Sequence, residues 1–139
     1  MINNKVVIDT NILIYSILED NKYYIESRNL IKNNFHNIVL TSKNISEFIV
    51  VLTKMNIDYS TINEHLRLLK DNFKLLYPDD KSIESFYKLI DKYKPKGNKV
   101  YDIEIVSILL ANGVNKIATF NKSDFQDITE IEIISTLTS

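Results

Sequence analysis

The stretch Lys5-Val6-Val7-Ile8-Asp9-Thr10-Asn11 decides which fold the sequence predicts. It is a short apolar run that ends in an acid and two small polar residues, and apolar Ile12-Leu13-Ile14-Tyr15 follows directly. This pattern is typical of a buried parallel strand that leads into a helix N-terminus. Asp9 would then lie at the carboxyl edge of the sheet, where ligands of open α/β sheets bind because strands end there and loops converge. Asp9 is therefore the first candidate for a functional residue.

Composition limits the remaining possibilities. The 139 residues, 45% of them apolar, are enough for one compact core, so we expect a single domain over residues 1–139. The net charge of -1 neither attracts nor excludes a polyanion, so nucleic-acid binding would need a local basic patch. The absence of cysteine excludes disulfides, thiolate metal sites and cysteine nucleophiles. Because no secretory signal or membrane-spanning apolar run is visible, we expect a soluble, cytoplasmic protein without membrane contact.

Apolar runs and helical periodicities alternate along the chain. The predicted strands are residues 5–9, 38–40, 74–77, 116–119 and 131–135. The predicted helices begin near residues 12, 22, 42, 60, 79 and 102. Ser42 is the expected N-cap of the third helix, and Ser60 or Thr61 that of the fourth. The fifth should turn Ile83, Phe86, Tyr87 and Ile90 inward. Strands that alternate with helices favour an α/β fold, with a central, mostly parallel sheet and helices on both faces.

Acidic residues recur where the predicted strands end. Asp9 follows the first strand, Glu47 lies one turn inside the helix after the second, Asp102 begins the apolar sixth helix, and Asn121 and Asp124 follow the fourth strand. If these strands are neighbours, the side chains converge on one cleft. Several carboxylates cannot share a small site in ionised form unless a cation neutralises them. Oxygen ligands without cysteine or histidine nearby indicate Mg²⁺, with Mn²⁺ as the alternative.

Four motifs resemble those of the PIN-domain ribonucleases. Val7-Ile8-Asp9-Thr10-Asn11-Ile12-Leu13 is similar to the family's opening motif, and Ser46-Glu47 to its second acidic position. Val100-Tyr101-Asp102, before the apolar helix that ends at Gly113, resembles the third, and Thr119-Phe120-Asn121-Lys122-Ser123-Asp124-Phe125 the closing motif. Length and motif order look most like the VapC-type toxins of bacterial toxin-antitoxin pairs. The resemblance covers nearly the whole chain.

The resemblance implies a fold, an activity and partners. The fold would be a PIN-like domain with a parallel sheet in the order 3-2-1-4-5. The activity would be that of a Mg²⁺-dependent endoribonuclease, which cleaves RNA phosphodiesters by metal-activated water. The protein would be a homodimeric toxin, and a disordered segment of its antitoxin partner would cover the active site.

Roles for individual residues follow from these motifs. Asp9, Glu47, Asp102 and Asp124 are the predicted catalytic residues, and Asp9 and Asp102 among them would hold the metal. Glu47 would bind the metal or orient the attacking water, while Asn11, Thr119 and Asn121 would orient ligands or substrate. Lys94, Lys96 and Lys99 belong to the densest basic stretch and are candidates for RNA binding.

Asn121 departs from the family pattern, because a fourth acid often occupies its position. An amide adds no charge and cannot act as a base, so the sequence leaves open whether one or two ions bind. It also keeps open an alternative function, a non-catalytic or weakly active module that binds RNA or protein.

Other interpretations compete with the nuclease. Each acid taken alone could simply cap a helix or face solvent. A haloacid-dehalogenase-like phosphotransferase would need a second aspartate at Asn11, and a response-regulator receiver would carry its phosphorylated aspartate on a later strand. Neither His36 nor His65 lies beside an acidic motif, so we expect no catalytic histidine. The conjunction of acids at one sheet edge favours the nuclease.

Overall fold

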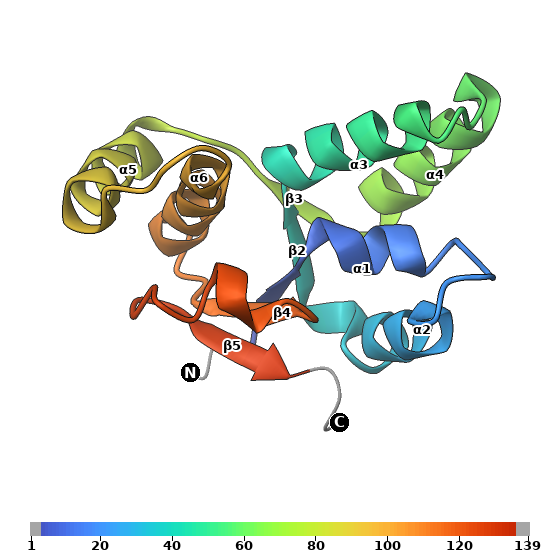
Figure 1. Ribbon diagram of the computed structural model, residues 1–139, viewed down its shortest axis with the longest axis horizontal. Helices are drawn as coiled ribbons and strands as arrows, with labels where there is room; N and C mark the ends of the chain where they lie inside the picture. Colours follow the sequence, from blue (N-terminus) through green and yellow to red (C-terminus); the bar gives the residue numbers. More distant parts are fainter. Residues whose placement is uncertain (1–3, 136–139) are drawn as a thin grey trace.

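The computed structural model describes residues 4–135. At its centre is a five-stranded sheet in the order β3-β2-β1-β4-β5, in which all neighbouring strands are parallel (Figure 1). The strands are β1 (Val6–Ile8), β2 (Ile38–Thr41), β3 (Lys74–Leu76), β4 (Lys116–Thr119) and β5 (Glu132–Ser135). The predicted α/β class and the strand order implied by the resemblance are both confirmed.

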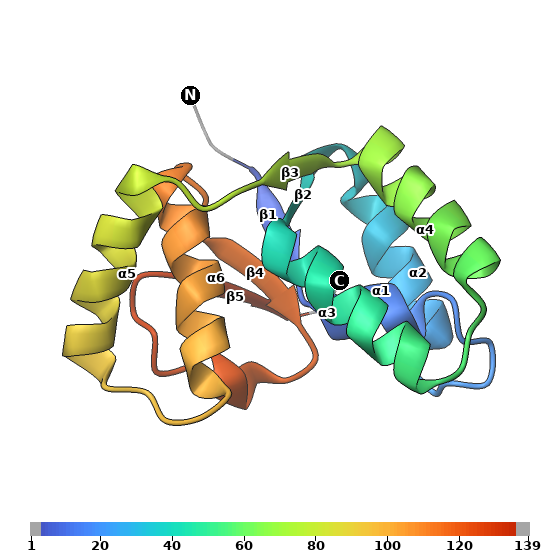
Figure 2. The same ribbon diagram turned by 90° about the horizontal axis from the view of Figure 1, so that it is seen from above.

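Helices cover the two faces of this sheet. They are α1 (Thr10–Tyr15), α2 (Tyr24–Asn33), α3 (Ser42–Lys54), α4 (Tyr59–Asn72), α5 (Asp80–Tyr93) and α6 (Lys99–Ala111), with short 3₁₀ helices η1 (Phe35–Asn37) and η2 (Lys122–Asp124). Helices α5 and α6 pack on one face, and α1 to α4 pack on the other (Figure 2). None of the helices within residues 4–135 has the length and apolar character needed to cross a bilayer.

The central strand β1 supplies both cores. Successive side chains of a strand point to opposite faces, so Val7 joins the core under α5 and α6 while Val6 and Ile8 join the core under α1 to α4. Strands β2 and β4 divide their side chains in the same way. Because these strands are buried on both faces, their sequences are continuously apolar and show no alternation.

Helix α6 is buried along most of its circumference. Its buried side chains are Ile103, Ile105, Val106, Ser107, Ile108 and Leu109. The helix begins at Lys99, so the predicted start at Asp102 is wrong: Lys99, Val100 and Tyr101 already form its first turn. Its end is as predicted, because Gly113 adopts a φ of 72° and lets the Val114 amide donate to the Leu109 carbonyl at 2.9 Å.

Two predicted helix caps are wrong by one to three positions. Thr41, not Ser42, caps α3, and Asp58, not Ser60 or Thr61, caps α4. In both cases the cap is the last residue with extended backbone, which lets its side-chain oxygen reach the amide three residues further on. The Asp58 carboxylate accepts from the Thr61 amide at 2.7 Å.

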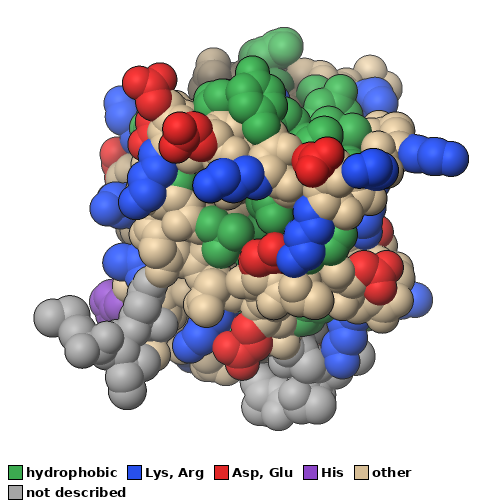
Figure 3. Space-filling model, turned by 90° about the vertical axis from the view of Figure 1, so that its left-hand side faces the viewer, with side chains coloured by type: hydrophobic (Ala, Val, Ile, Leu, Met, Phe, Trp, Pro, Cys, Tyr) green, Lys and Arg blue, Asp and Glu red, His purple; other side chains and the backbone are tan. Residues whose placement is uncertain are grey.

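Helix α5 turns part of its apolar surface outward. Ile83 and Tyr87 were expected to point inward, but 43% and 69% of their surface is exposed. The face toward α6 instead carries Leu89, with Phe86 and Ile90 packed beside it. Figure 3 views the molecule from the α5 side and shows hydrophobic side chains between alternating basic and acidic ones. The helical periodicity was predicted correctly, and Phe86 and Ile90 do pack inward. The prediction was wrong for Ile83 and Tyr87, because the buried face of α5 is rotated away from them.

A buried amide joins the two central strands. Asn44 Oδ1 accepts from the backbone amide of Thr41 at 2.8 Å and from its hydroxyl at 3.0 Å, which completes the cap of α3. Its Nδ2 donates to Thr10 Oγ1 at 3.0 Å and to the Ile8 carbonyl at 3.4 Å. Asn44 therefore fixes the start of α3 against the junction of β1 and α1.

We predict that Asn44→Ala lowers the free energy of unfolding by about 2–3 kcal/mol, because it leaves buried partners without hydrogen bonds. Urea denaturation measures this. Asn63→Ala, on the exposed side of α4, is the matched control and should change the stability by less than about 0.5 kcal/mol. Equal effects of the two substitutions would mean that the Asn44 contacts do not contribute to stability.

Candidate active site

Asp9 lies where the carboxyl ends of β1 and β4 meet. Thr119 Oγ1 donates to Asp9 Oδ2 at 2.8 Å, and the Asp9 amide donates to the Ala118 carbonyl at 2.9 Å. Asp9 occupies the N-cap position of α1, but its side chain makes no capping hydrogen bond. Burial raises the pKa of this carboxylate, and backbone hydrogen bonds from Asn11 and Thr10 oppose the rise, so the start of α1 also acts on it. The Asp9 carboxylate is therefore held by the neighbouring strand and lies against the first turn of the helix.

The turn after β4 brings a second carboxylate to the same edge. The Asn121 amide donates to Thr119 Oγ1 at 2.9 Å, which fixes the start of the turn. Asn121 Nδ2 then donates to Asp124 Oδ2 at 2.8 Å, and Ser123 Oγ donates to Asn121 Oδ1 at 2.7 Å. Asn121 therefore orients Asp124 through a local network.

Glu47 extends from α3 toward the site and is held by Thr10, which is held in turn by Asn44. The sequence interpretation gave neither Thr10 nor Asn44 a role. Thr10 Oγ1 donates to Glu47 Oε1 at 3.4 Å and itself accepts from Asn44 Nδ2. Thr10 and Asn44 are both buried, whereas Glu47 lies at the exposed rim. A buried polar residue inside an apolar helical face was the available signal for Asn44. Nothing in the sequence pairs it with Thr10.

Burial and neighbouring acidic charges raise the pKa values of Asp9, Glu47 and Asp102. Burial raises the pKa of Asp9, and the charge of Asp124 adds to this while the Thr119 hydrogen bond opposes it. Burial and the charge of Asp9 raise the pKa of Glu47. Burial, followed by the charge of Asp124, raises the pKa of Asp102 to about 7, with Lys99 opposing and Asp9 and Glu47 adding to the rise. The structure thus brings the four predicted acids into one electrostatic cluster.

The donor chemistry of this cluster fits a hard cation. Its members offer only carboxylate, amide and hydroxyl oxygens, which Mg²⁺ and Mn²⁺ prefer. Within residues 4–135, no three acidic or histidine side chains already surround a common metal position. Mg²⁺ keeps several of its waters, so carboxylates at wider spacing can hold it partly through water. A cation would also relieve the repulsion that raises these pKa values.

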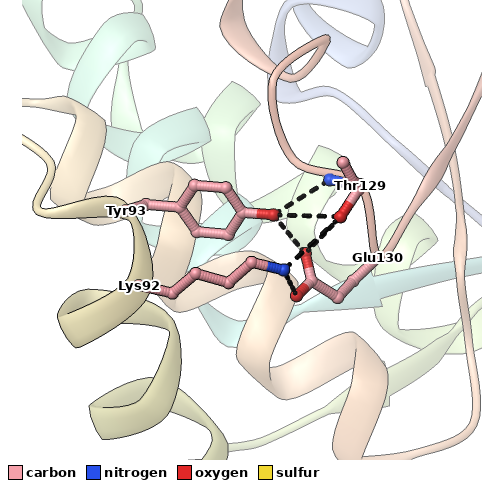
Figure 4. A network of polar contacts seen from close by, with 4 residues as sticks. All are labelled: Lys92, Tyr93, Thr129 and Glu130. Carbon is pink, nitrogen blue, oxygen red and sulfur yellow. Dashed lines mark hydrogen bonds and ion pairs between the residues drawn. The ribbon is translucent and has the colours of Figure 1, made fainter.

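The lysines of the predicted basic stretch, Lys92 to Lys99, do not form one patch, because they have different neighbours. Lys92 pairs with Glu130 at 2.7 Å, and the Tyr93 hydroxyl donates to the same carboxylate at 2.5 Å (Figure 4). This network ties the end of α5 to the loop before β5. Lys94 pairs with Asp91 at 3.6 Å, and Lys96 is exposed.

Lys99 and Lys43 are the cations that the structure brings to the carboxylates. Lys99 Nζ donates to the Asp124 carbonyl and lowers the pKa of Asp102. Lys43, which the sequence interpretation did not single out, lowers the pKa of Glu47 and pairs with Glu104 at 3.2 Å. Both lysines lie in the first turn of a helix whose acid belongs to the cluster.

Comparisons with solved structures identify the fold. The chain superposes on VapBC-1 from nontypeable Haemophilus influenzae with a TM-score of 0.73 and 23% identity, covering 96% of this chain and 98% of that one. Mycobacterium tuberculosis VapC20, described as a sarcin-ricin loop cleaving toxin, gives 0.73 and 8%, with coverage of 92% and 99%. A toxin-antitoxin complex from Klebsiella pneumoniae gives 0.70 and 18%, with coverage of 95% and 98%. No curated protein matches the sequence significantly.

The parallel sheet and the acids at its carboxyl edge define the protein as an α/β domain with an acidic site. A match to a family profile then shows which family of such domains it belongs to. The profile of the PIN domain matches residues 6–131. The chain therefore belongs to the PIN-domain family. The match spans the stretches that hold Asp9, Glu47, Asp102 and Asp124, so the resemblance inferred from the motifs is confirmed.

The raised pKa of Asp102 predicts how the metal-free protein responds to pH. In the folded state Asp102 holds a proton up to about pH 7, whereas in the unfolded chain it releases that proton near its ordinary pKa of 3.8. Its contribution to stability is therefore complete below about pH 4 and is lost as the pH rises through about 7.

Asp102→Asn stays neutral throughout, so with chelator present it should stabilise the protein at pH 8 and leave it little changed at pH 4. We expect the free energy of unfolding at pH 8 to rise by about 1–2 kcal/mol. This is less than the full pKa shift would give, because solvent screens a carboxyl that is only partly buried. Urea denaturation at both pH values measures it. Asp71→Asn, exposed on α4, is the control. A variant with the wild-type dependence on pH would show that Asp102 does not carry this proton.

Proposed function

We propose that this protein is a metal-dependent endoribonuclease that hydrolyses RNA phosphodiester bonds and serves as the toxin of a toxin-antitoxin pair. The observation that carries the proposal is the convergence of Asp9, Glu47, Asp102 and Asp124, where burial and then the neighbouring acidic charges raise the pKa values of the first three. Membership of the PIN-domain family supports it, as does the likeness to VapC20, which is described as a sarcin-ricin loop cleaving toxin. Carboxylates arranged in this way suit cation-assisted attack on a phosphodiester.

Asp9 and Asp102 would hold the cation, Mg²⁺ or Mn²⁺. Thr119 donates to Asp9 Oδ2 and so orients the Asp9 carboxylate toward a ligand at this edge of the sheet. A cation bound there supplies positive charge for phosphate oxygens and lowers the pKa of water. Asp124, held by Asn121, adds negative charge to the same side of the site.

Glu47 would orient the attacking water or accept its proton. Its raised pKa makes it a better proton acceptor than an ordinary surface glutamate. Thr10 holds the Glu47 carboxylate, and Asn44 holds Thr10. Asn11, Thr119 and Asn121 would orient substrate or carboxylates. This chain of contacts would hold the Glu47 carboxylate between α3 and the start of α1.

RNA would be held by cations around the carboxylates. Lys99 has the strongest support among the predicted lysines, because it lies beside Asp102 and Asp124. Lys94 and Lys96 would extend the positive potential along the loop before α6, although Lys94 shares its charge with Asp91. Each phosphate contact would add to the salt dependence of binding.

A protein antitoxin and a second copy of the chain are the proposed partners. The similar structures include toxin-antitoxin complexes from several bacteria, which supports an antitoxin. The exposed apolar side chains Ile83 and Tyr87 on α5 offer surface for a protein contact. A folded domain that only binds RNA or protein is the competing function, and Asn121 at the fourth acidic position is the observation in its favour.

The first test is Asp9→Asn, which keeps the size of the side chain and its hydrogen bond with Thr119 but removes its charge. We expect Mg²⁺-dependent RNA cleavage to fall by at least about a hundredfold while the fold is retained. Gel assays of RNA fragments and a thermal melt measure the two. Asp71→Asn on α4 is the matched control. Full activity of Asp9→Asn would place the site elsewhere, and wild-type protein inactive with Mg²⁺ and Mn²⁺ would favour the binding module.

The second test concerns the number of cations. Asn121→Asp replaces the amide that holds Asp124 with a carboxylate, so it adds one negative charge beside the cluster. We predict one strong Mg²⁺ or Mn²⁺ site in the wild type and several-fold tighter binding in the variant. Calorimetric titration without RNA measures both. Asn63→Asp adds the same charge on α4 and should have no effect. Two strong wild-type sites, or unchanged affinity in Asn121→Asp, would contradict the prediction.

A further inference from the structure

Three aromatic rings form a cluster at the end of α1. Tyr15 closes that helix, Tyr23 lies just before α2, and Phe120 follows β4. The Tyr23 and Phe120 rings are stacked, with centroids 4.6 Å apart and planes 18° from parallel. Tyr15 lies 5.5 Å from Tyr23 and 6.1 Å from Phe120, tilted by 33° and 34°. We call these residues the aromatic cluster.

The aromatic cluster adjoins the carboxylates through the chain itself. Phe120 stands between Thr119, which holds Asp9, and Asn121, which holds Asp124. Tyr15 belongs to the same short helix that begins beside Asp9. Phe120 therefore connects the aromatic cluster to the carboxyl end of β4, since its ring stacks on Tyr23 while its neighbours in the chain hold the carboxylates. A polymer whose phosphate meets the carboxylates would bring its adjacent unit toward the rings.

The exposure of the aromatic cluster distinguishes it from ordinary core packing. Tyr15 and Phe120 rest on the core under α1 to α4, yet all three rings are only partly buried. The Lys22 ammonium lies 4.9 Å from the centroid of Tyr23 and is exposed. Stacked rings beside an exposed cation suit a ligand with a flat π face and a negative charge.

We propose that Tyr23 and Phe120, supported by Tyr15, form a stacking subsite for an unpaired nucleobase of the RNA strand, with Lys22 at its phosphate. This inference rests on the proposed function, because it assumes that the neighbouring phosphate is the one the carboxylates engage. Splayed bases of single-stranded RNA stack on aromatic side chains, whereas bases paired inside an A-form duplex cannot. The subsite therefore selects single-stranded segments and tolerates different bases.

Two oligomers of equal charge test the subsite. One is a fluorescently labelled uridine octamer, and the other is a ribose-phosphate octamer without bases. Affinities are measured by anisotropy with Ca²⁺ in place of Mg²⁺, and gels confirm that the oligomers stay intact. We expect wild-type protein to bind the uridine octamer about tenfold more tightly than the abasic one. Tyr23→Leu and Phe120→Leu should each remove most of this preference and leave the affinity for the abasic octamer unchanged.

Tyr59→Leu at the start of α4 is the matched control, because it removes an aromatic ring that is 63% exposed and lies outside the aromatic cluster. It should keep the wild-type preference. Thermal melts accompany each variant. Should Phe120→Leu fail to fold, Tyr23→Leu carries the test, because Phe120 packs on the core under α1 to α4, whereas Tyr23 is not among the described side chains packed there. Unchanged preference in Tyr23→Leu would overturn the subsite and leave the rings to a protein contact. An equal loss of affinity for both octamers would overturn it too, since bases would not be involved.

RNA cleavage is measured separately, so the two proposals fail in different ways. If wild-type protein cleaves RNA with Mg²⁺ but Tyr23→Leu keeps its preference for bases, the nuclease stands and the subsite is wrong. If wild-type protein cleaves nothing yet loses base preference on Tyr23→Leu, the subsite stands and the nuclease is wrong.

Discussion

The hydrogen bond from Thr119 to Asp9 is the contact on which the acidic site depends. It joins the ends of β1 and β4 and fixes one oxygen of the Asp9 carboxylate. The same hydroxyl accepts from the Asn121 amide, so it also sets the start of the turn that carries Asp124. A parallel sheet makes this possible, because its adjacent strands deliver their carboxyl ends to one edge. Two acids distant in sequence are thereby placed by a single threonine.

The same edge concentrates like charges that a stable fold would ordinarily keep apart. The effect is largest at Asp102, whose pKa is raised to about 7 by burial and by its acidic neighbours. Lys99 and Lys43 reduce the repulsion from either side without neutralising it. Unfavourable repulsion of this kind is common where a protein binds a cation or a polar substrate, because the bound ligand supplies the opposite charge. The acidic cluster therefore makes more sense as a binding site than as part of the scaffold.

The sequence predicted the strands well because strands buried on both faces are continuously apolar, whereas the strand order was implied by the resemblance to the PIN-domain ribonucleases. It also located the four acids, since their positions after strands are visible in one dimension. It failed at Asn44, whose partner Thr10 is brought near only by the pairing of β1 with β2. Likewise, Tyr23 and Phe120 lie in turns without periodicity, so nothing predicted that their rings stack. The missed residues owe their positions to tertiary contacts, which local pattern cannot encode.

The central place of β1 in the sheet also affects how the protein emerges during synthesis. Strand β1 pairs with β2 on one side and with β4, from much later in the chain, on the other. Helices α1 to α4 can begin to pack while β1 still lacks that second neighbour. Domains fold largely as units as the chain is made, and distant strand pairings form slowly. The acidic cluster cannot assemble until the segment through Asp124 has left the ribosome, so an incomplete chain would lack the complete acidic site.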